Sequence, residues 1–156
     1  MALAYGGIVK KALIAFCAMF LFASNAVCTE TLPNEDAAKG LAAKIMTKVI
    51  AGDLDAVFKI MTVYSSLGPT EIDRVATQAK VSRDQSKQRY GSSTGYKFID
   101  SKKAGDSMLR IRYIEETEKN ALLLWVFYFN KPKDGWIMNS FSWSEDYKAL
   151  FNDDSK

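Results

Sequence analysis

The sequence contains no histidine, and this absence narrows the chemistry that its other side chains can perform. Histidine-based catalytic triads and histidine-ligated zinc sites are excluded. The chain also has no glycine-rich phosphate loop, no nucleophile elbow and no spaced cluster of metal ligands. We therefore predict no catalytic residue, no metal site and no cofactor.

The remaining polar groups that suit a binding site are phenols, a carboxylate and an amide on predicted strands. Such groups act as acids or bases only where burial moves their pKa. Each also has a simpler interpretation, a packed tyrosine with a hydrogen-bonded hydroxyl or an aspartate in water. Taken together they predict a ligand pocket formed by Tyr96, Asp100, Tyr113, Tyr128 and Asn139.

Two arginines stand two residues apart on one predicted strand, so that they share a face of the sheet. Arg110 and Arg112 have the geometry to hold an anion or a partner's carboxylate. The alternative is a pair of surface charges lying over apolar neighbours. The acidic pair Glu115 and Glu116 stands beside a predicted turn, and we interpret it as solvated rather than catalytic.

Hydrophobic periodicity predicts three helices and then four strands. Asn34 suits a helix start, Gly52 a stop and Pro69 a first helical position. The helices are expected over residues 34–51, 53–61 and 69–90. Short breaks rich in Gly and Asp indicate hairpins, with strands over 96–102, 107–116, 120–130 and 135–144 and a last helical turn over 146–151.

Four-residue turns would pair Lys102 with Ser107, Glu115 with Asn120, and Asn130 with Gly135. This register gives a helix-facing side that is almost wholly apolar. The opposite side then carries, beside the arginines, an exposed aromatic and aliphatic block: Leu123, Trp125, Phe127, Phe129, Trp136 and Met138. Soluble monomers rarely expose such a patch, so we predict that it forms the interface of a symmetric homodimer.

The N-terminal segment has the three parts of a secretory signal peptide. Lys10 and Lys11 precede twelve apolar residues over 12–23, and Ser24 and Ala26 suit cleavage after position 26. A retained anchor is the alternative, but twelve helical residues rise only about 18 Å, less than a bilayer core. After cleavage Cys28 is the single thiol; lipid attachment there is disfavoured by the preceding Val27.

The mature chain would keep 19 basic and 18 acidic residues, because Lys10 and Lys11 leave with residues 1–26, so its net charge is +1. This charge predicts no nucleic-acid partner. No linker divides the mature chain. We expect a signal peptide (1–26), a flexible mature N-terminus (27–33), one domain (34–151) and a tail (152–156), with no membrane span after cleavage.

The last predicted hairpin carries a family resemblance. Its first strand ends in Phe127, Tyr128 and Phe129, Asp134 and Gly135 make the turn, and Trp136 leads the return. With three preceding helices, it resembles small secreted bacterial members of the nuclear-transport-factor-2-like (NTF2-like) superfamily, also called SnoaL-like or cystatin-like roll. The resemblance implies an α+β fold, a cone-shaped roll of three N-terminal helices packed on a curved four-stranded antiparallel meander.

Members of that superfamily include isomerases, dehydratases, small hydrolases and secretion-system components, and their outer sheet face often pairs two subunits. Members that use an Asp–His or Tyr–His pair have no counterpart here. We therefore expect an exported, non-enzymatic, dimeric binding or interaction protein, periplasmic or secreted, with a small apolar pocket for an apolar ligand or a partner protein. The alternatives are a histidine-free isomerase or hydrolase and a component of an envelope secretion system.

Overall fold

The structure is a computed structural model and describes residues 29–151. Capping side chains set the helix boundaries within this range. The Asn34 side chain accepts a hydrogen bond from the Ala37 N–H at 2.8 Å, and Asp53 accepts one from Ala56 at 3.2 Å. The resulting helices are α1 (Glu35–Ile50), α2 (Leu54–Tyr64) and α3 (Pro69–Tyr90). None of the helices within 29–151 is long and apolar enough to cross a bilayer.

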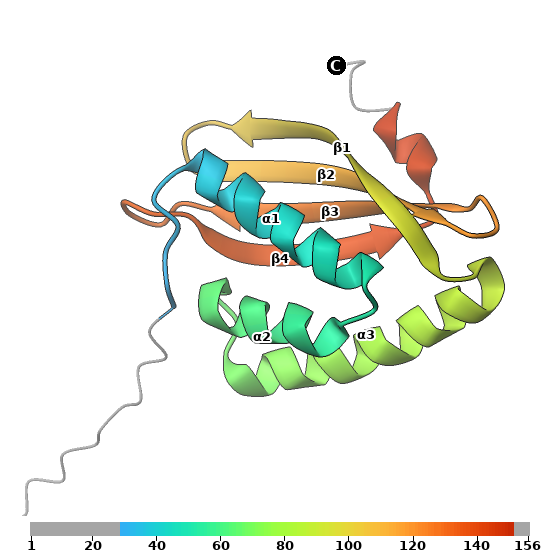
Figure 1. Cartoon of the computed structure of the whole chain (residues 1–156). Coiled ribbons are helices and arrows are strands. Elements are labelled where there is room, and N and C mark those ends of the chain that lie inside the picture. Colours follow the sequence, from blue (N-terminus) through green and yellow to red (C-terminus); the bar gives the residue numbers. More distant parts are fainter. Residues whose placement is uncertain (1–28, 152–156) are drawn as a thin grey trace, which may run out of the picture.

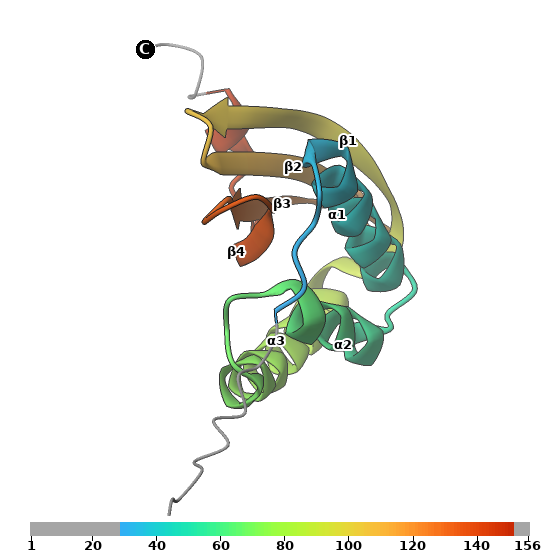
Figure 2. The same cartoon turned by 90° about the vertical axis from the view of Figure 1, so that its left-hand side faces the viewer.

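The second half of the chain forms one antiparallel sheet in the order β1-β2-β3-β4. Its elements are β1 (Ser93–Ala104), β2 (Met108–Thr117), β3 (Leu122–Asn130), β4 (Ile137–Ser144) and a short 3₁₀ helix, η1 (Tyr147–Leu150). The sheet curves around α1, while α2 and α3 lie below it and η1 lies on the other side (Figures 1 and 2). The predicted α+β architecture of three helices on a curved four-stranded meander is confirmed.

All three hairpins differ from the predicted register. Lys102 pairs with Arg110 rather than Ser107, Asn130 pairs with Ile137 rather than Gly135, and the pairing of β2 with β3 also shifts. Glu115 pairs with Leu123 rather than Asn120, because the hairpin has a three-residue turn instead of four. The Thr117 N–H donates to the Ala121 carbonyl at 3.2 Å, and Asn120 takes a left-handed φ of 59°. The shift is an odd number of residues, so every side chain of β3 lies on the face opposite to the predicted one.

Among the register shifts of the outer strands, two change the faces of the predicted site residues. In β1 the register shifts between Phe98 and Asp100, so that Asp100 pairs with Arg112. In β4 the residue pairing jumps from Met138 to Ser140 opposite Phe129 and Tyr128. A bulge of this kind re-aims the side chains that follow it.

The described residues before α1 pack against the domain, whereas the sequence predicted a flexible N-terminus over 27–33. Leu32 and Trp136 exchange two backbone hydrogen bonds of 2.8 Å, and the Glu30 N–H donates to the Val63 carbonyl at 2.9 Å. Leu32 is buried in the core. Residues 30–32 therefore pack with the domain, whereas the sequence predicted that the domain starts at 34. The predicted signal peptide (1–26) and tail (152–156) lie outside the described residues.

Candidate functional site

The carboxylate of Glu115 is buried between the sheet and α3, and the sequence interpretation of it was wrong. Glu115 is 0 % exposed, although it was expected to be solvated beside a turn. Counting every second residue of β2 from Leu109 places Glu115 on the face that packs against the helices. That inward position is the signal by which sequence reasoning could have found it.

Arg83 of α3 neutralises this carboxylate. Its Nη1 and Nη2 donate to Glu115 Oε2 and Oε1 at 2.9 and 2.6 Å, a bidentate pair. The Trp125 indole N–H donates to Oε2 at 2.6 Å, and the Ser93 hydroxyl bonds to Oε1. Buried charge is costly unless it is paired and hydrogen-bonded, and this carboxylate receives donors from three other elements.

The same contacts fix the arginine. Its guanidinium lies 5.6 Å from the centre of the Trp125 ring, and Nη2 also donates to Ser93 Oγ at 3.1 Å. The Arg83 side chain is 12 % exposed, so one edge of the group still faces outward. Arg83 and Glu115 are 32 residues apart in the sequence, so their pairing has no local sequence signal.

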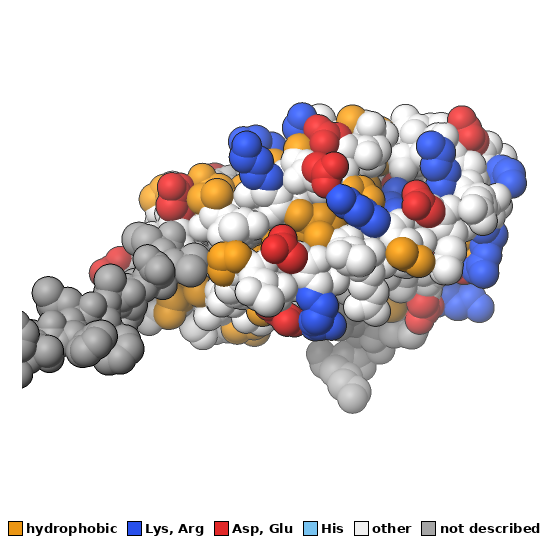
Figure 3. Space-filling view, turned by 90° about the horizontal axis from the view of Figure 1, so that it is seen from below, with side chains coloured by type: hydrophobic (Ala, Val, Ile, Leu, Met, Phe, Trp, Pro, Cys, Tyr) orange, Lys and Arg blue, Asp and Glu red, His pale blue; other side chains and the backbone are white. Residues whose placement is uncertain are grey.

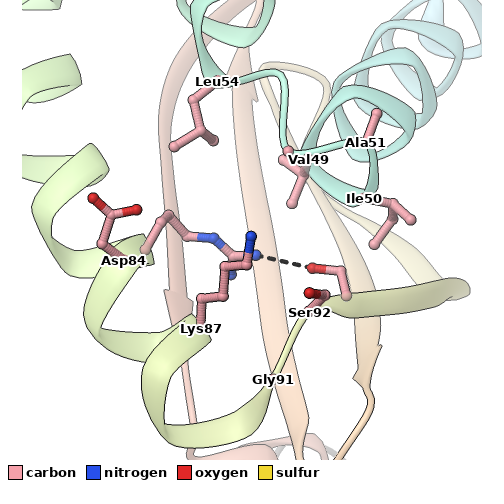
Figure 4. A pocket seen from close by; sticks show the side chains of 11 residues that line it. Val49, Ile50, Ala51, Leu54, Asp84, Lys87, Gly91 and Ser92 are labelled. Atoms are coloured by element: carbon pink, nitrogen blue, oxygen red, sulfur yellow. Dashed lines mark hydrogen bonds between the residues drawn. The ribbon is translucent and has the colours of Figure 1, made fainter.

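A cavity of about 260 Å³ opens beside this cluster, between the end of α1, the second half of α3 and the start of β1 (Figure 4). Its apolar wall comes from the C-terminal end of α1 and the start of α2: Val49, Ile50 and Leu54. Its polar wall comes from α3 and the chain entering β1: Arg83, Asp84, Lys87, Ser92 and Ser93. Lys87 and Asp84 are exposed at the mouth, and Arg83 lies deeper.

Gly91 shapes the polar wall. Its φ of +81° lets the chain leave α3 and turn directly into β1. A Cβ at this position would lie 2.6 Å from Glu118 Oε2 and 2.8 Å from Glu118 Cβ. The Glu118 carboxylate in turn accepts the Ser92 N–H at 2.8 Å. This turn places Ser92 and Ser93 opposite Lys87.

The predicted ligand pocket does not form, because its five members lie in different places. Tyr96 and Tyr113 do share the inner face, with ring centres 5.6 Å apart, but they pack closely against the core. The Tyr96 hydroxyl is hydrogen-bonded to Thr47 Oγ1 at 3.1 Å, which supports the simpler interpretation of a packed tyrosine.

The other three members lie away from the cone. Asp100 follows the β1 irregularity and faces Arg112, Tyr128 is on the outer side of β3, and Asn139 is the exposed residue skipped in the β4 pairing. The turn length and the two bulges explain the error, since each reverses the side to which the following residues point.

The arginine pair lies on the outer face of the sheet, as predicted. Its carboxylate partner, Asp100, belongs to the same chain. Arg112 Nε donates to Asp100 Oδ1 at 2.8 Å, with a second bond between Nη2 and Oδ2. Arg110 Nη2 lies 3.9 Å from the same carboxylate. Asp100 thus takes the place that was suggested for an anion or a partner's carboxylate.

The predicted dimer face lies in the core. The inverted β3 and the β4 register put all six residues against the helices, each 3 % exposed or less: Leu123, Trp125, Phe127, Phe129, Trp136 and Met138. On the surface formed by α2 and α3, apolar side chains are separated by charges of both signs (Figure 3). The homodimer itself stays a prediction. The exposed aromatic patch from which it was inferred is buried in the core.

Burial raises the pKa of Tyr113 to about 12, and the neighbouring Tyr96 adds to the effect. Between pH 10 and 12 the unfolded chain loses this proton while the folded chain keeps it. The free energy of unfolding is therefore expected to fall as the pH rises, by about 2 kcal/mol from this group. Below the unfolded pKa the contribution is constant.

Urea unfolding of wild type and Tyr113→Phe across this range measures the effect. The substitution keeps the ring but removes the ionisable hydroxyl. The stability of the variant relative to wild type should increase by about 2 kcal/mol between about pH 9 and about pH 12. Comparing the two proteins cancels the titration of all other groups. A constant difference would show that the hydroxyl titrates alike in both states.

The described residues contain no group of three or more His, Cys, Asp or Glu side chains placed to hold a metal ion. The cluster at Glu115 instead satisfies its charges within the protein. The fold and the cavity thus define an α+β roll, three helices on a curved four-stranded antiparallel sheet, with a small half-polar cavity between α1, α3 and β1.

No protein-family model and no curated protein matches the sequence. One solved structure is similar, a Campylobacter jejuni protein provisionally named an NTF2-like transpeptidase. It shares 14 % sequence identity and a TM-score of 0.48, over 66 % of this chain and 97 % of that chain.

Proposed function

We propose that this chain is an exported, non-enzymatic binding protein that holds a small amphipathic molecule in the cavity between α1, α3 and β1. The observation that carries the proposal is the division of that cavity into an apolar wall of Val49, Ile50 and Leu54 and a polar wall ending in Lys87. Half-polar cavities of this size suit a ligand with an apolar body and a charged or polar head.

The charge of the polar wall favours an acidic head group. Lys87 is exposed at the mouth, where its ammonium group can pair with a carboxylate, and Ser92 adds a hydroxyl beside it. Arg83 lies deeper and is already fixed by Glu115, so it adds a rigid donor surface without needing to reorganise. Asp84 at the same mouth restricts where an anionic group can sit.

The engagement of Glu115 argues against acid–base catalysis. A general base needs a lone pair within reach of a substrate proton. Both oxygens of Glu115 are already hydrogen-bonded, to Arg83, Trp125 and Ser93. Export follows from the predicted signal peptide at residues 1–26, and a bacterial periplasm or an extracellular space is the proposed location.

Octanoate is a suitable test ligand, with octanol as its uncharged counterpart. We expect octanoate to bind the mature protein and to change the fluorescence of Trp125, which contacts Arg83 at the cavity. Lys87→Gln should weaken binding about tenfold, the usual scale for a lost charged hydrogen bond. Lys44→Gln, an exposed position on α1 away from the cavity lining, should leave affinity unchanged.

Equal affinity for octanoate and octanol would show that the cavity does not recognise an acidic head group. Equal loss in Lys87→Gln and Lys44→Gln would show that binding is a general charge effect. Absence of any binding would contradict the proposal. Octanoate binding that persists in calorimetry after the cavity is filled by Ser92→Trp would place the ligand elsewhere.

A further inference from the structure

The outer edge of β4 lies open for most of its length. β4 is the last strand of the sheet, and only its start is paired on the outside, where the Ser66 N–H donates to the Met138 carbonyl at 3.2 Å. Ser65 forms a parallel bridge with Met138 at the same place. Within residues 29–151, no backbone hydrogen bond from outside the sheet reaches residues 139–144.

A groove runs beside this open edge. A cavity of about 290 Å³ is lined on one side by α3 and on the other by residues 141–143 of β4. It shares Gln78 and Ser82 with a second hollow on α3, which is lined by residues between Arg74 and Gln85. On the α3 side the groove is lined by Gln78 and Ser82 together with Val75 and Ala79.

The side chains along the edge alternate in a way that suits a fifth strand. Phe141 and Trp143 point to the inner side and are only partly buried, whereas Ser140, Ser142 and Ser144 are small and exposed on the outer side. The edge residues carry no Lys or Pro, the usual residues that prevent strand addition.

We propose that the groove between β4 and α3 binds an extended peptide segment of a partner protein by strand addition. The segment continues the pairing that Ser65 and Ser66 begin at Met138, and it covers about six residues, the length of the open edge. Every second side chain of the segment is apolar and packs beside Phe141 and Trp143. This site is separate from the cavity at Lys87.

The groove supplies more than backbone pairing. Gln78 offers an amide and Ser82 a hydroxyl to the side of the peptide that faces α3. Val75 and Ala79 on the same helix provide apolar contact for the inward-pointing side chains. These groups favour a segment that alternates aliphatic or aromatic residues with small polar ones.

A displayed library of eight-residue peptides with that alternation tests the proposal on the full mature protein. The matched library is identical except that proline occupies the central position, which removes a backbone donor. We expect enrichment from the first library only. Hydrogen exchange with a selected peptide should show slower exchange of backbone amides in residues 139–144.

Two tryptophan variants locate the binding. Ser82→Trp fills the groove from α3 and is expected to weaken a selected peptide at least about tenfold. Gln88→Trp, an exposed position on the same helix outside the groove lining, should leave affinity unchanged. Lys87→Gln, which disturbs the proposed ligand cavity, should also leave peptide binding unchanged.

Three results would overturn the proposal: no enrichment, peptides that bind Ser82→Trp as well as wild type, or protection that maps outside β4. Light scattering of the protein without peptide shows whether it is a monomer or a dimer, and thus tests whether a second copy occupies the edge. If the protein alone is a dimer and its β4 amides are already protected, the edge is occupied by a second copy of this chain rather than by a partner's peptide.

Discussion

Glu115→Gln is expected to lower the free energy of unfolding by about 3 kcal/mol or more, the usual effect of breaking a buried ion pair. The amide would leave the buried guanidinium of Arg83 without a counter-charge. One of the amide positions would also present hydrogens where Trp125 or Ser93 now bonds to an oxygen. Urea unfolding followed by circular dichroism measures the loss.

The neighbouring residue gives a matched control. Glu116 is on the opposite face of β2 and pairs with Lys97 at 2.5 Å, where the two side chains are 36 % and 71 % exposed. Glu116→Gln should therefore cost less than about 1 kcal/mol. The double variant Arg83→Gln/Glu115→Gln should be more stable than the sum of its single changes implies, because no unpaired charge remains. Equal losses in Glu115→Gln and Glu116→Gln would contradict the buried pair.

Phe127→Glu is expected to prevent folding. The ring of Phe127 is 0 % exposed, 6.1 Å from the rings of Tyr113 and Trp125. Losing a buried phenylalanine usually costs about 3–5 kcal/mol, and an unpaired buried carboxylate adds to that. Such a sum approaches the whole stability of a small domain. Circular dichroism and the dispersion of NMR amide signals report whether a fold remains.

Tyr128→Glu is the control for this prediction, because the next residue of β3 is on the outer face and is 36 % exposed. This variant should stay folded with a small change in stability. A folded Phe127→Glu beside an unfolded Tyr128→Glu would contradict the observed pairing of β3 and restore the register predicted from the sequence, with its aromatic dimer face. Light scattering of wild type tests the homodimer independently of the register.

The helices and the number of strands could be predicted because their signals are local. Asn34 and Asp53 accept bonds from N–H groups three residues away, and Gly91 stops α3 through its own backbone conformation. Alternation along β2 likewise separates Leu109, Ile111 and Tyr113 from the arginines between them. Each of these choices is decided within one turn of helix or one strand, so the sequence alone determines it.

The face of β3 could not be predicted, because both of its faces are hydrophobic. Leu122, Leu124 and Val126 alternate with Leu123, Trp125 and Phe127, and burial of either set is favourable. The choice depends on a three-residue turn in which Asn120 adopts a left-handed conformation. Turns of three and four residues are both common in hairpins, so composition does not separate them.

The candidate site was decided by the tertiary structure. Arg83 is one of several charged residues on a polar stretch of α3, and nothing within that stretch distinguishes it. Its role arises only when the curved sheet brings Glu115, Trp125 and Ser93 to the same point. A long-range ion pair has no local sequence signature, because its energy depends on how completely the surrounding elements exclude water from both charges.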